Sequence, residues 1–225
     1  MKKVNYAAID VGSNAVRLLI KGVDKEAMTP DEKFSKELLL RVPLRLGFDV
    51  FTLGALSDAK AVKLKRLMKA FKQLMKIYEV DAYRACATSA MRDAANGKEV
   101  IETITRKSGI RIDIINGEEE ARLVYDNHIE YLADKNADYI YVDVGGGSTE
   151  ISLIHQGILR SSRSYNQKPL YHSLQKNAMG FTKLFSKTTG RNNISPPEKI
   201  PIIVSLFPIF EFSGLTTCKI SRSIV

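Results

Sequence analysis

The stretch Ile9-Asp10-Val11-Gly12-Ser13-Asn14 has a relative later in the same chain, Val142-Asp143-Val144-Gly145-Gly146-Gly147-Ser148-Thr149. In each, an apolar run ends in a carboxylate and turns through glycine and small polar residues into a second apolar run. Glycine lets the backbone approach an anion closely, successive turn amides can point at its oxygens, and an aspartate can hold a hydrated cation. The pair therefore predicts two halves of one phosphate site.

Length and composition are those of a globular protein. The chain has 225 residues, 44% of them hydrophobic and 26% charged, which suits one large domain or two small ones. Cys86 and Cys218 have no partner spacing, which indicates a reducing compartment, and we expect Cys86 in the core. Asp10 interrupts the apolar start, and the apolar run 200–210 is too short for a membrane span. We therefore expect a cytoplasmic protein with no membrane partner.

The formal net charge of +9 raises the question of nucleic-acid binding. Residues 166–225 carry eight Lys or Arg against two Glu, so most of the excess lies in this tail. No interleaved aromatic platform accompanies the charge, and a nucleic-acid partner is therefore not expected. A modest positive field also suits a polyanionic substrate.

The first half of the chain alternates strand and helix signals. Ser57 suits the start of an amphipathic helix, Gly109 the end of a second one, and Thr88 and Ser89 the N-cap of a helix between them. The predicted elements are a hairpin of two strands (5–11, 15–22), a strand (37–46), a helix (57–78), a strand (81–87), a helix (98–107), a strand (111–115) and a helix (118 to about 132). This order predicts an α/β layer domain.

The second glycine pattern would start the same plan again. Strands are expected at 139–144, 148–154 and 158–164, after which the regular pattern stops. We therefore predict an α/β protein of two tandem domains, the second incomplete. The expected boundaries are 1–118 for the first domain, 119–165 for the start of the second, and 166–225 for an irregular basic tail.

Common nucleotide and catalytic motifs are missing. The chain has no G-x-x-x-x-G-K-[ST] sequence, the second glycine loop lacks the third glycine of a dinucleotide fingerprint, and the three histidines have neither metal spacing nor a G-x-S-x-G partner. What remains suits phosphoryl transfer, where catalysis is positioning and charge neutralisation. The candidates are magnesium-binding carboxylates (Asp10, Asp143, Glu150), loop amides (Gly12, Ser13, Asn14 and Gly145, Gly146, Gly147, Ser148) and cationic forks (Arg17, Arg92).

Four segments together resemble the exopolyphosphatase and guanosine pentaphosphate phosphohydrolase family. They are Asp10-Val11-Gly12-Ser13-Asn14-Ala15-Val16-Arg17-Leu18-Leu19-Ile20, Ala87-Thr88-Ser89-Ala90-Met91-Arg92-Asp93-Ala94, Asn116-Gly117-Glu118-Glu119-Glu120-Ala121-Arg122-Leu123 and Val142-Asp143-Val144-Gly145-Gly146-Gly147-Ser148-Thr149-Glu150. The resemblance covers about residues 4 to 165. It implies the actin-like (ribonuclease H-like) fold of the sugar-kinase-like superfamily, whose two similar domains close over a phosphate cleft.

The resemblance also implies a reaction. Water would attack the terminal phosphate of polyphosphate or of guanosine pentaphosphate, with a magnesium-type metal (Mg2+), and the two substrates stay open alternatives. The family's catalytic glutamate maps to Glu119 or Glu120, of which we favour Glu120, although carboxylates in a first helical turn also complement the helix dipole. Asp143 and Glu150 match acidic cleft positions, and Arg92 matches a phosphate-contacting arginine.

After about Tyr165 the family pattern ends. We expect residues 166–225 to be a divergent or frameshifted end, which would leave the cleft without much of one wall. The alternative function is accordingly an inactive remnant that binds phosphate or nucleotide. An ATP-dependent kinase or chaperone ATPase of the superfamily would need an adenosine pocket that the sequence does not provide. A homodimer is a further expectation.

Overall fold

The computed structural model of the chain describes residues 3–29, 33–128, 136–144, 148–166 and 202–205. The chain divides into two compact units, Met1–Asn116 and Gly117–Val225. Each unit is described by itself. The sequence places its domain boundary at 118.

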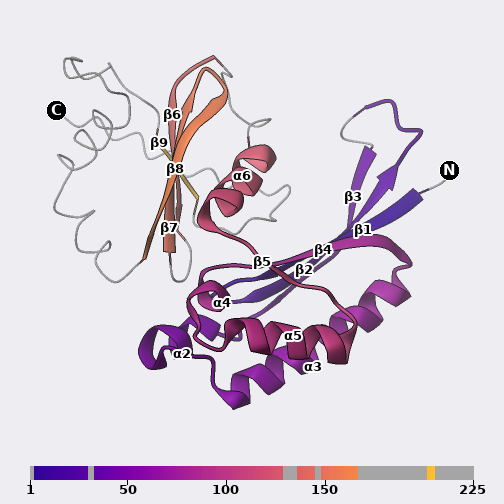
Figure 1. Cartoon of the computed structure of the whole chain (residues 1–225). Coiled ribbons are helices and arrows are strands. Elements are labelled where there is room, and N and C mark those ends of the chain that lie inside the picture. The colour runs from indigo at the N-terminus through magenta and orange to yellow at the C-terminus, as the bar shows by residue number, and fades with distance from the viewer. Residues whose placement is uncertain (1–2, 30–32, 129–135, 145–147, 167–201, 206–225) are drawn as a thin grey trace. The chain divides into compact units, whose positions relative to one another are not determined.

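A five-stranded sheet in the order β3-β2-β1-β4-β5 forms the first unit (Figure 1). Strands β1 (Lys3–Val11), β2 (Val16–Asp24) and β3 (Phe34–Val42) are antiparallel neighbours. Strands β4 (Val80–Ala87) and β5 (Asp113–Ile114) continue the sheet in parallel to β1. Val11 pairs with Val16, which confirms the predicted hairpin and places its turn at residues 12–15.

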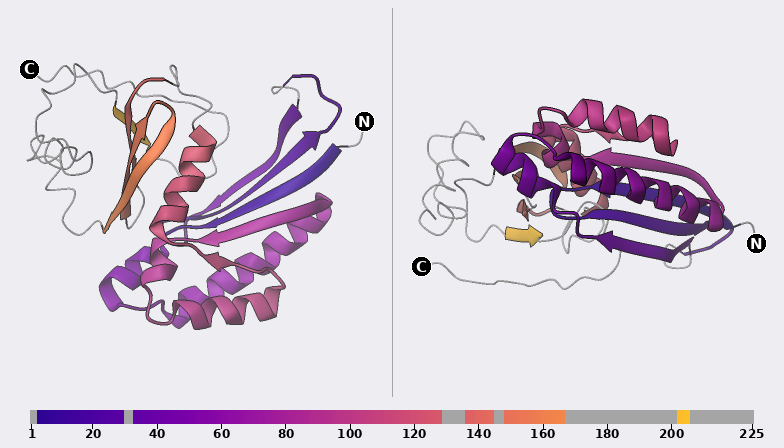
Figure 2. Two further views of the ribbon diagram at one scale, coloured as in Figure 1. Left: turned by 45° about the horizontal axis from the view of Figure 1, so that its top comes forward. Right: turned by 90° about the horizontal axis from the view of Figure 1, so that it is seen from below.

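Two long helices, α3 (Asp58–Ile77) and α5 (Gly97–Ser108), cover one face of this sheet (Figures 1 and 2). The apolar stripe of α3 buries its side chains against the strands, each contributing about 1.5–3 kcal/mol; it consists of Leu64, Met68, Phe71 and Met75. The predicted start and end signals are confirmed, because the Ser57 side chain accepts from the Lys60 amide and Gly109 ends α5 with φ 71°. Cys86 is buried, as predicted.

Two short helices complete the first unit, α2 (Leu46–Leu53) and α4 (Ser89–Asp93). Helix α2 was not predicted, since the sequence analysis extends a strand to residue 46. Pro43 cannot donate to a strand ladder, and Gly54 ends α2 with φ 75°. The predicted strand 111–115 is likewise shorter, since only Asp113–Ile114 pair with β4.

Helix α6 (Gly117–His128) and a four-stranded sheet in the order β8-β7-β6-β9 form the second unit. Strands β6 (Tyr139–Val144), β7 (Ser148–His155) and β8 (Ile158–Asn166) are antiparallel neighbours, which confirms the three predicted strands. A small core joins the helix to the sheet and contains Val124, Tyr139, Tyr141 and Ile154.

Strand β9 (Ile202–Ser205) lies in the predicted irregular tail and pairs in parallel with β6. The prediction of an irregular tail is therefore wrong for these four residues, because an Ile-Ile-Val run readily joins a sheet. The remaining tail calls, 167–201 and 206–225, lie outside the described residues. No helix in the described part of the chain combines the length and apolar character needed to cross a bilayer.

Candidate functional site

The first glycine turn is tight, and it lies beside a buried carboxylate. The Gly12 amide donates to the Ala15 carbonyl at 3.2 Å. A Cβ on Gly12 would lie 3.1 Å from that carbonyl oxygen and 3.7 Å from each Asp10 carboxylate oxygen. Glycine is therefore the residue that lets the turn close over Asp10 without crowding.

Two backbone hydrogen bonds fix the direction of this turn. The Ser13 carbonyl accepts from the Gly47 amide and the Asn14 carbonyl from the Arg45 amide, both at 2.8 Å. Because a trans peptide unit is planar, the amides of Asn14 and Ala15 point away from these carbonyls. Within the described residues neither amide has a hydrogen-bond acceptor. The turn can therefore present two adjacent donors to an anion.

Helix α2, which supplies Gly47, is itself anchored to α3. Asp49 accepts from the Ser57 hydroxyl, and its Oδ1 lies 2.8 Å from Lys60 Nζ. These hydrogen bonds, first from Lys60 and then from Ser57, lower the pKa of the Asp49 carboxyl. An ionised, doubly bonded Asp49 thus holds α2 against the turn.

Asp10 and Arg17 form a cross-strand pair at the same end of the sheet. They are directly opposite in the β1–β2 ladder, and Arg17 Nη1 donates to Asp10 Oδ2 at 3.1 Å. Asp10 is only 2% exposed. Burial raises the pKa of the Asp10 carboxyl to about 6, against the lowering effect of Arg17. Asp10 is thus mostly ionised at neutral pH, at an energetic cost.

Helix α4 brings a second hydroxyl and a second arginine to this end of the unit. The Ser89 and Ser13 hydroxyl oxygens lie 2.8 Å apart, and both side chains are buried. Arg92 Nη1 donates to the Ile115 carbonyl at 3.0 Å. The predicted side-chain cap by Thr88 is wrong in mechanism, since no side-chain hydrogen bond is made and the Thr88 carbonyl accepts from the Arg92 amide at 3.0 Å.

In the second unit, two predicted carboxylates occupy one row of the sheet. Asp143, Glu150 and Ser164 are directly opposite one another on β6, β7 and β8, and directly opposed residues share a face. Asp143 is 5% exposed and Glu150 is 2% exposed. The Ser164 hydroxyl donates to Glu150 Oε1 at 2.8 Å. A buried acid therefore faces another acid, without a cation in the row.

Helix α6 lies directly against this row. A Cβ on Gly117 would be 2.9 Å from the Ser164 Cβ, so the start of the helix touches β8. Val124, seven residues on, packs into the core of the same sheet face. Glu120 lies between them on the same side of the helix and is 7% exposed, whereas Glu119 is partly exposed and Glu118 exposed. Glu120 is thus the acid of the run that the helix turns inward.

The predicted residues therefore fall into two groups. The first unit holds Asp10, Gly12, Ser13, Asn14, Arg17 and Arg92, and the second holds Glu119, Glu120, Asp143 and Glu150. Gly145, Gly146 and Gly147 lie outside the described residues, as does the side chain of Ser148. Across the ranges that the structure covers, no group of three or more His, Cys, Asp or Glu side chains is placed to hold a metal.

The sequence analysis missed several residues that shape these groups. Gly47 and Arg45 hold the turn, Ser89 meets Ser13, and Ser164 meets Glu150. The contacts of Gly47, Arg45 and Ser164 are made between segments that no short motif links. A signal existed only for Ser89, which belongs to the quoted 87–94 segment but was interpreted as a helix cap.

Comparisons with known proteins agree with this fold. The Ppx/GppA phosphatase family matches residues 38–169. Exopolyphosphatase 2 of Mycobacterium tuberculosis is 30% identical over 167 residues, which are 72% of this chain and 51% of that protein. The chain thus spans about half the length of the curated relatives it matches.

Solved structures give the same result. The Aquifex aeolicus PPX-GPPA enzyme superposes with a TM-score of 0.68 at 25% identity, covering 90% of this chain and 68% of that one. A Bacteroides thetaiotaomicron protein with an actin-like ATPase fold superposes with a TM-score of 0.52 at 10% identity, covering 89% of this chain and 81% of that one. The chain therefore has an α/β fold with actin-like ATPase-fold neighbours, and the tandem, incomplete arrangement stays a prediction.

Proposed function

Because this chain belongs to the Ppx/GppA phosphatase family, we propose that it releases terminal phosphate from inorganic polyphosphate by water attack. One observation carries the proposal. Glu120 is turned inward on the side of α6 that packs against the Asp143–Glu150 row. A carboxylate in that setting suits a general base that takes a proton from water.

The first unit would hold the phosphate. Amides of Asn14 and Ala15 point away from the hydrogen bonds that fix the turn, and Arg17 and Arg92 supply positive charge at the same end of the unit. These groups match the several negative oxygens of a phosphoryl group. Binding in this way positions the phosphorus atom and neutralises charge that would repel the incoming water.

The second unit would carry out the proton transfer. As the water oxygen forms its bond to the terminal phosphorus, the anhydride P–O bond breaks and the bridging oxygen leaves with the shortened chain. Glu120 receives the proton that the water loses. Glu119 is the other candidate of the run, and its partial exposure makes it the weaker one.

Magnesium fits the carboxylates of the second unit. Mg2+ is commonly held by one or two carboxylates together with water and substrate phosphates, so a pair is sufficient. Asp143 and Glu150 are buried, directly opposite and of like charge, a pairing that a divalent cation relieves. When bound, the ion would supply charge neutralisation at the phosphoryl oxygens. Asp10, in the other unit, stays a predicted third ligand.

A second candidate is a protein that binds phosphate or nucleotide without turnover. It is favoured by the length of the chain, about half that of the curated relatives. Guanosine pentaphosphate is a further substrate candidate, because it presents the same terminal group to the same turn. A cytoplasmic location and a homodimer remain proposals.

Phosphate release from polyphosphate in the presence of Mg2+ tests the proposal, with Glu118→Gln as the matched control for Glu119→Gln and Glu120→Gln. Loss of the base should lower the rate on the order of 100- to 10,000-fold for Glu120→Gln, while Glu118→Gln stays within a few fold. Activity that survives both the 119 and 120 variants contradicts the base. Thermal stabilisation by polyphosphate with no release would establish the binding-only candidate.

A further inference from the structure

The face of the first sheet opposite α3 and α5 carries a patch of positive charge. Side chains alternate along each strand, and the buried core uses Ile9, Leu18 and Leu40. The alternate positions pair across β2 and β3 as Arg17 with Arg41 and Lys21 with Lys36. Arg84 on β4 lies opposite Ala8 of β1 and belongs to the same face. We call Arg17, Lys21, Lys36, Arg41 and Arg84 the basic sheet face.

Both β2–β3 pairs on this face are pairs of like charge. Directly opposed like charges destabilise a sheet, and here two occur on one face, four residues apart on β2. The acidic member of these rows is Asp10, which already accepts from Arg17. A repeated cost of this kind is offset when an anion binds across the pairs.

The cations remain accessible. Lys36, Arg41 and Arg84 are exposed, and Lys21 is partly exposed. Burial, and after it the charge of Lys36, lowers the pKa of Lys21 to about 8, which reflects the positive field at this pair. Tyr6, Phe34 and Leu39 are also exposed on this face, at 41%, 50% and 38%.

The face begins at the phosphate turn. Arg17 is one residue beyond the first residue of β2, and Asp10 lies beside Gly12. Lys21 is four residues further along β2, or about 13 Å, and β3 adds its cations about 5 Å to the side. Positive charge therefore extends from the turn over a length of several phosphates.

We propose that the basic sheet face binds the internal phosphates of a linear polyphosphate whose terminal phosphate occupies the turn. This inference rests on the proposed function and deepens it by naming the substrate class. A long chain would contact both like-charge pairs, whereas a compact ligand such as guanosine pentaphosphate would contact only the pair nearest the turn. The face thus favours long chains over short ones.

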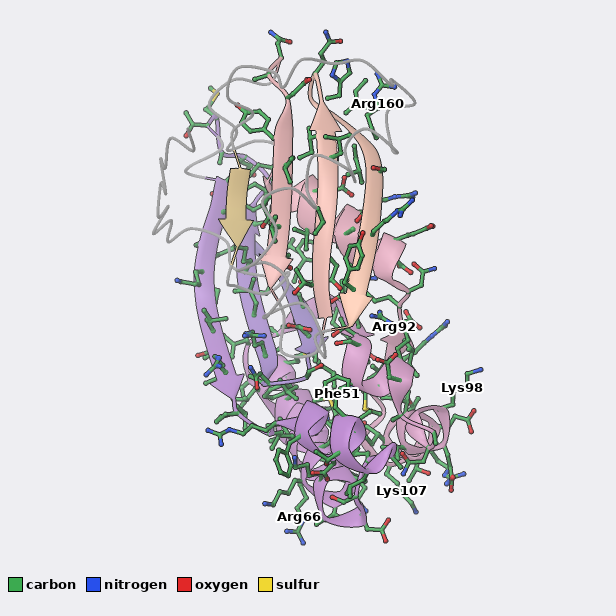
Figure 3. The ribbon with its side chains drawn as sticks, turned by 90° about the vertical axis from the view of Figure 1, so that its left-hand side faces the viewer. Phe51, Arg66, Arg92, Lys98, Lys107 and Arg160 are labelled. Carbon is green, nitrogen blue, oxygen red and sulfur yellow. The ribbon has the colours of Figure 1, made fainter. Side chains whose placement is uncertain are left out.

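Equilibrium binding of long-chain polyphosphate and of tripolyphosphate tests the proposal in the double variant Lys36→Gln/Arg41→Gln. Its matched control is Arg66→Gln/Lys98→Gln, which removes two exposed cations from the helical side of the same unit (Figure 3). We expect the double variant to weaken long-chain binding on the order of tenfold, because each exposed charge pair contributes up to about 1 kcal/mol. Tripolyphosphate binding and the control should change less than twofold.

Three results would overturn the proposal: no change in long-chain binding, an equal loss in the control, or an equal loss for tripolyphosphate. Single-stranded DNA of matched charge is a further probe. Equal wild-type affinity for this DNA, with an equal loss in the double variant, would make the face a nucleic-acid surface and also overturn it. Chain-length-dependent binding without phosphate release would support the face and contradict the proposed function, so the two failures are distinguishable.

Discussion

The two units use similar turn-forming strands with opposite charge balance. In the first unit, buried Asp10 has Arg17 directly opposite, and the turn beside it offers amides. In the second, buried Asp143 has Glu150 directly opposite, with Ser164 next in the row. A buried acid beside arginine belongs to a surface that binds anions, whereas paired acids require a cation or a proton. The difference indicates that the first unit binds phosphate and the second performs the chemistry.

The comparison can be broken most strongly at Arg92. Replacing Arg92 with Gln should lower kcat/KM for polyphosphate by about 100- to 1,000-fold, because a preorganised donor to the phosphoryl group is lost. Steady-state phosphate release measures the effect. Arg106→Gln, which removes an exposed arginine near the end of α5, is the control. Equal kinetics for wild type and the Arg92 variant would remove this arginine from the anion-binding group.

Asp10→Asn sharpens the comparison through stability. Burial raises the Asp10 pKa from 3.8 to about 6, so between these pH values the folded state holds the proton more tightly than the unfolded state. The stability from protonated Asp10 is complete below pH 4 and lost as pH rises through 6. We expect wild type to lose up to about 3 kcal/mol over this range relative to Asp10→Asn. Urea unfolding at pH 4 and pH 7 tests this, and parallel pH profiles for the two proteins would contradict it.

In the second unit, Gly117→Ala tests the packing of α6 on the carboxylate row. The new methyl would lie 2.9 Å from the Ser164 Cβ, and such overpacking costs about 1–3 kcal/mol. Hydrogen exchange should show lost protection in α6 and β8, with β1 and β2 unchanged. Gly54→Ala is a useful contrast: its new Cβ meets nothing within 4 Å, although φ 75° imposes backbone strain. Unchanged protection in α6 would contradict the contact.

Local signals in the sequence were sufficient for much of the fold. The hairpin turn, the Ser57 cap, the Gly109 end and the apolar stripe of α3 each depend on neighbouring residues, and all were predicted. Helix α2 and strand β9 were missed. A short helix after Pro43 has too few turns for a clear period, and β9 is defined by its pairing with β6.

For the candidate site, the sequence supplied residue types and the structure supplied their partners. The Asp10–Arg17 contact follows from the hairpin register, but the raised pKa of Asp10 depends on burial by the whole unit. The inward orientation of Glu120 depends on Gly117 and Val124 packing against strands far along the chain. Neither property can be obtained from a motif, because both arise from contacts between distant segments.

The central claim is that binding belongs to the first unit and proton transfer to Glu120. Equilibrium polyphosphate binding and single-turnover phosphate release, measured side by side on Glu120→Gln, test it most directly. The account predicts binding within about threefold of wild type and release slower by at least about 100-fold. Binding that weakens by the same factor as release would contradict it.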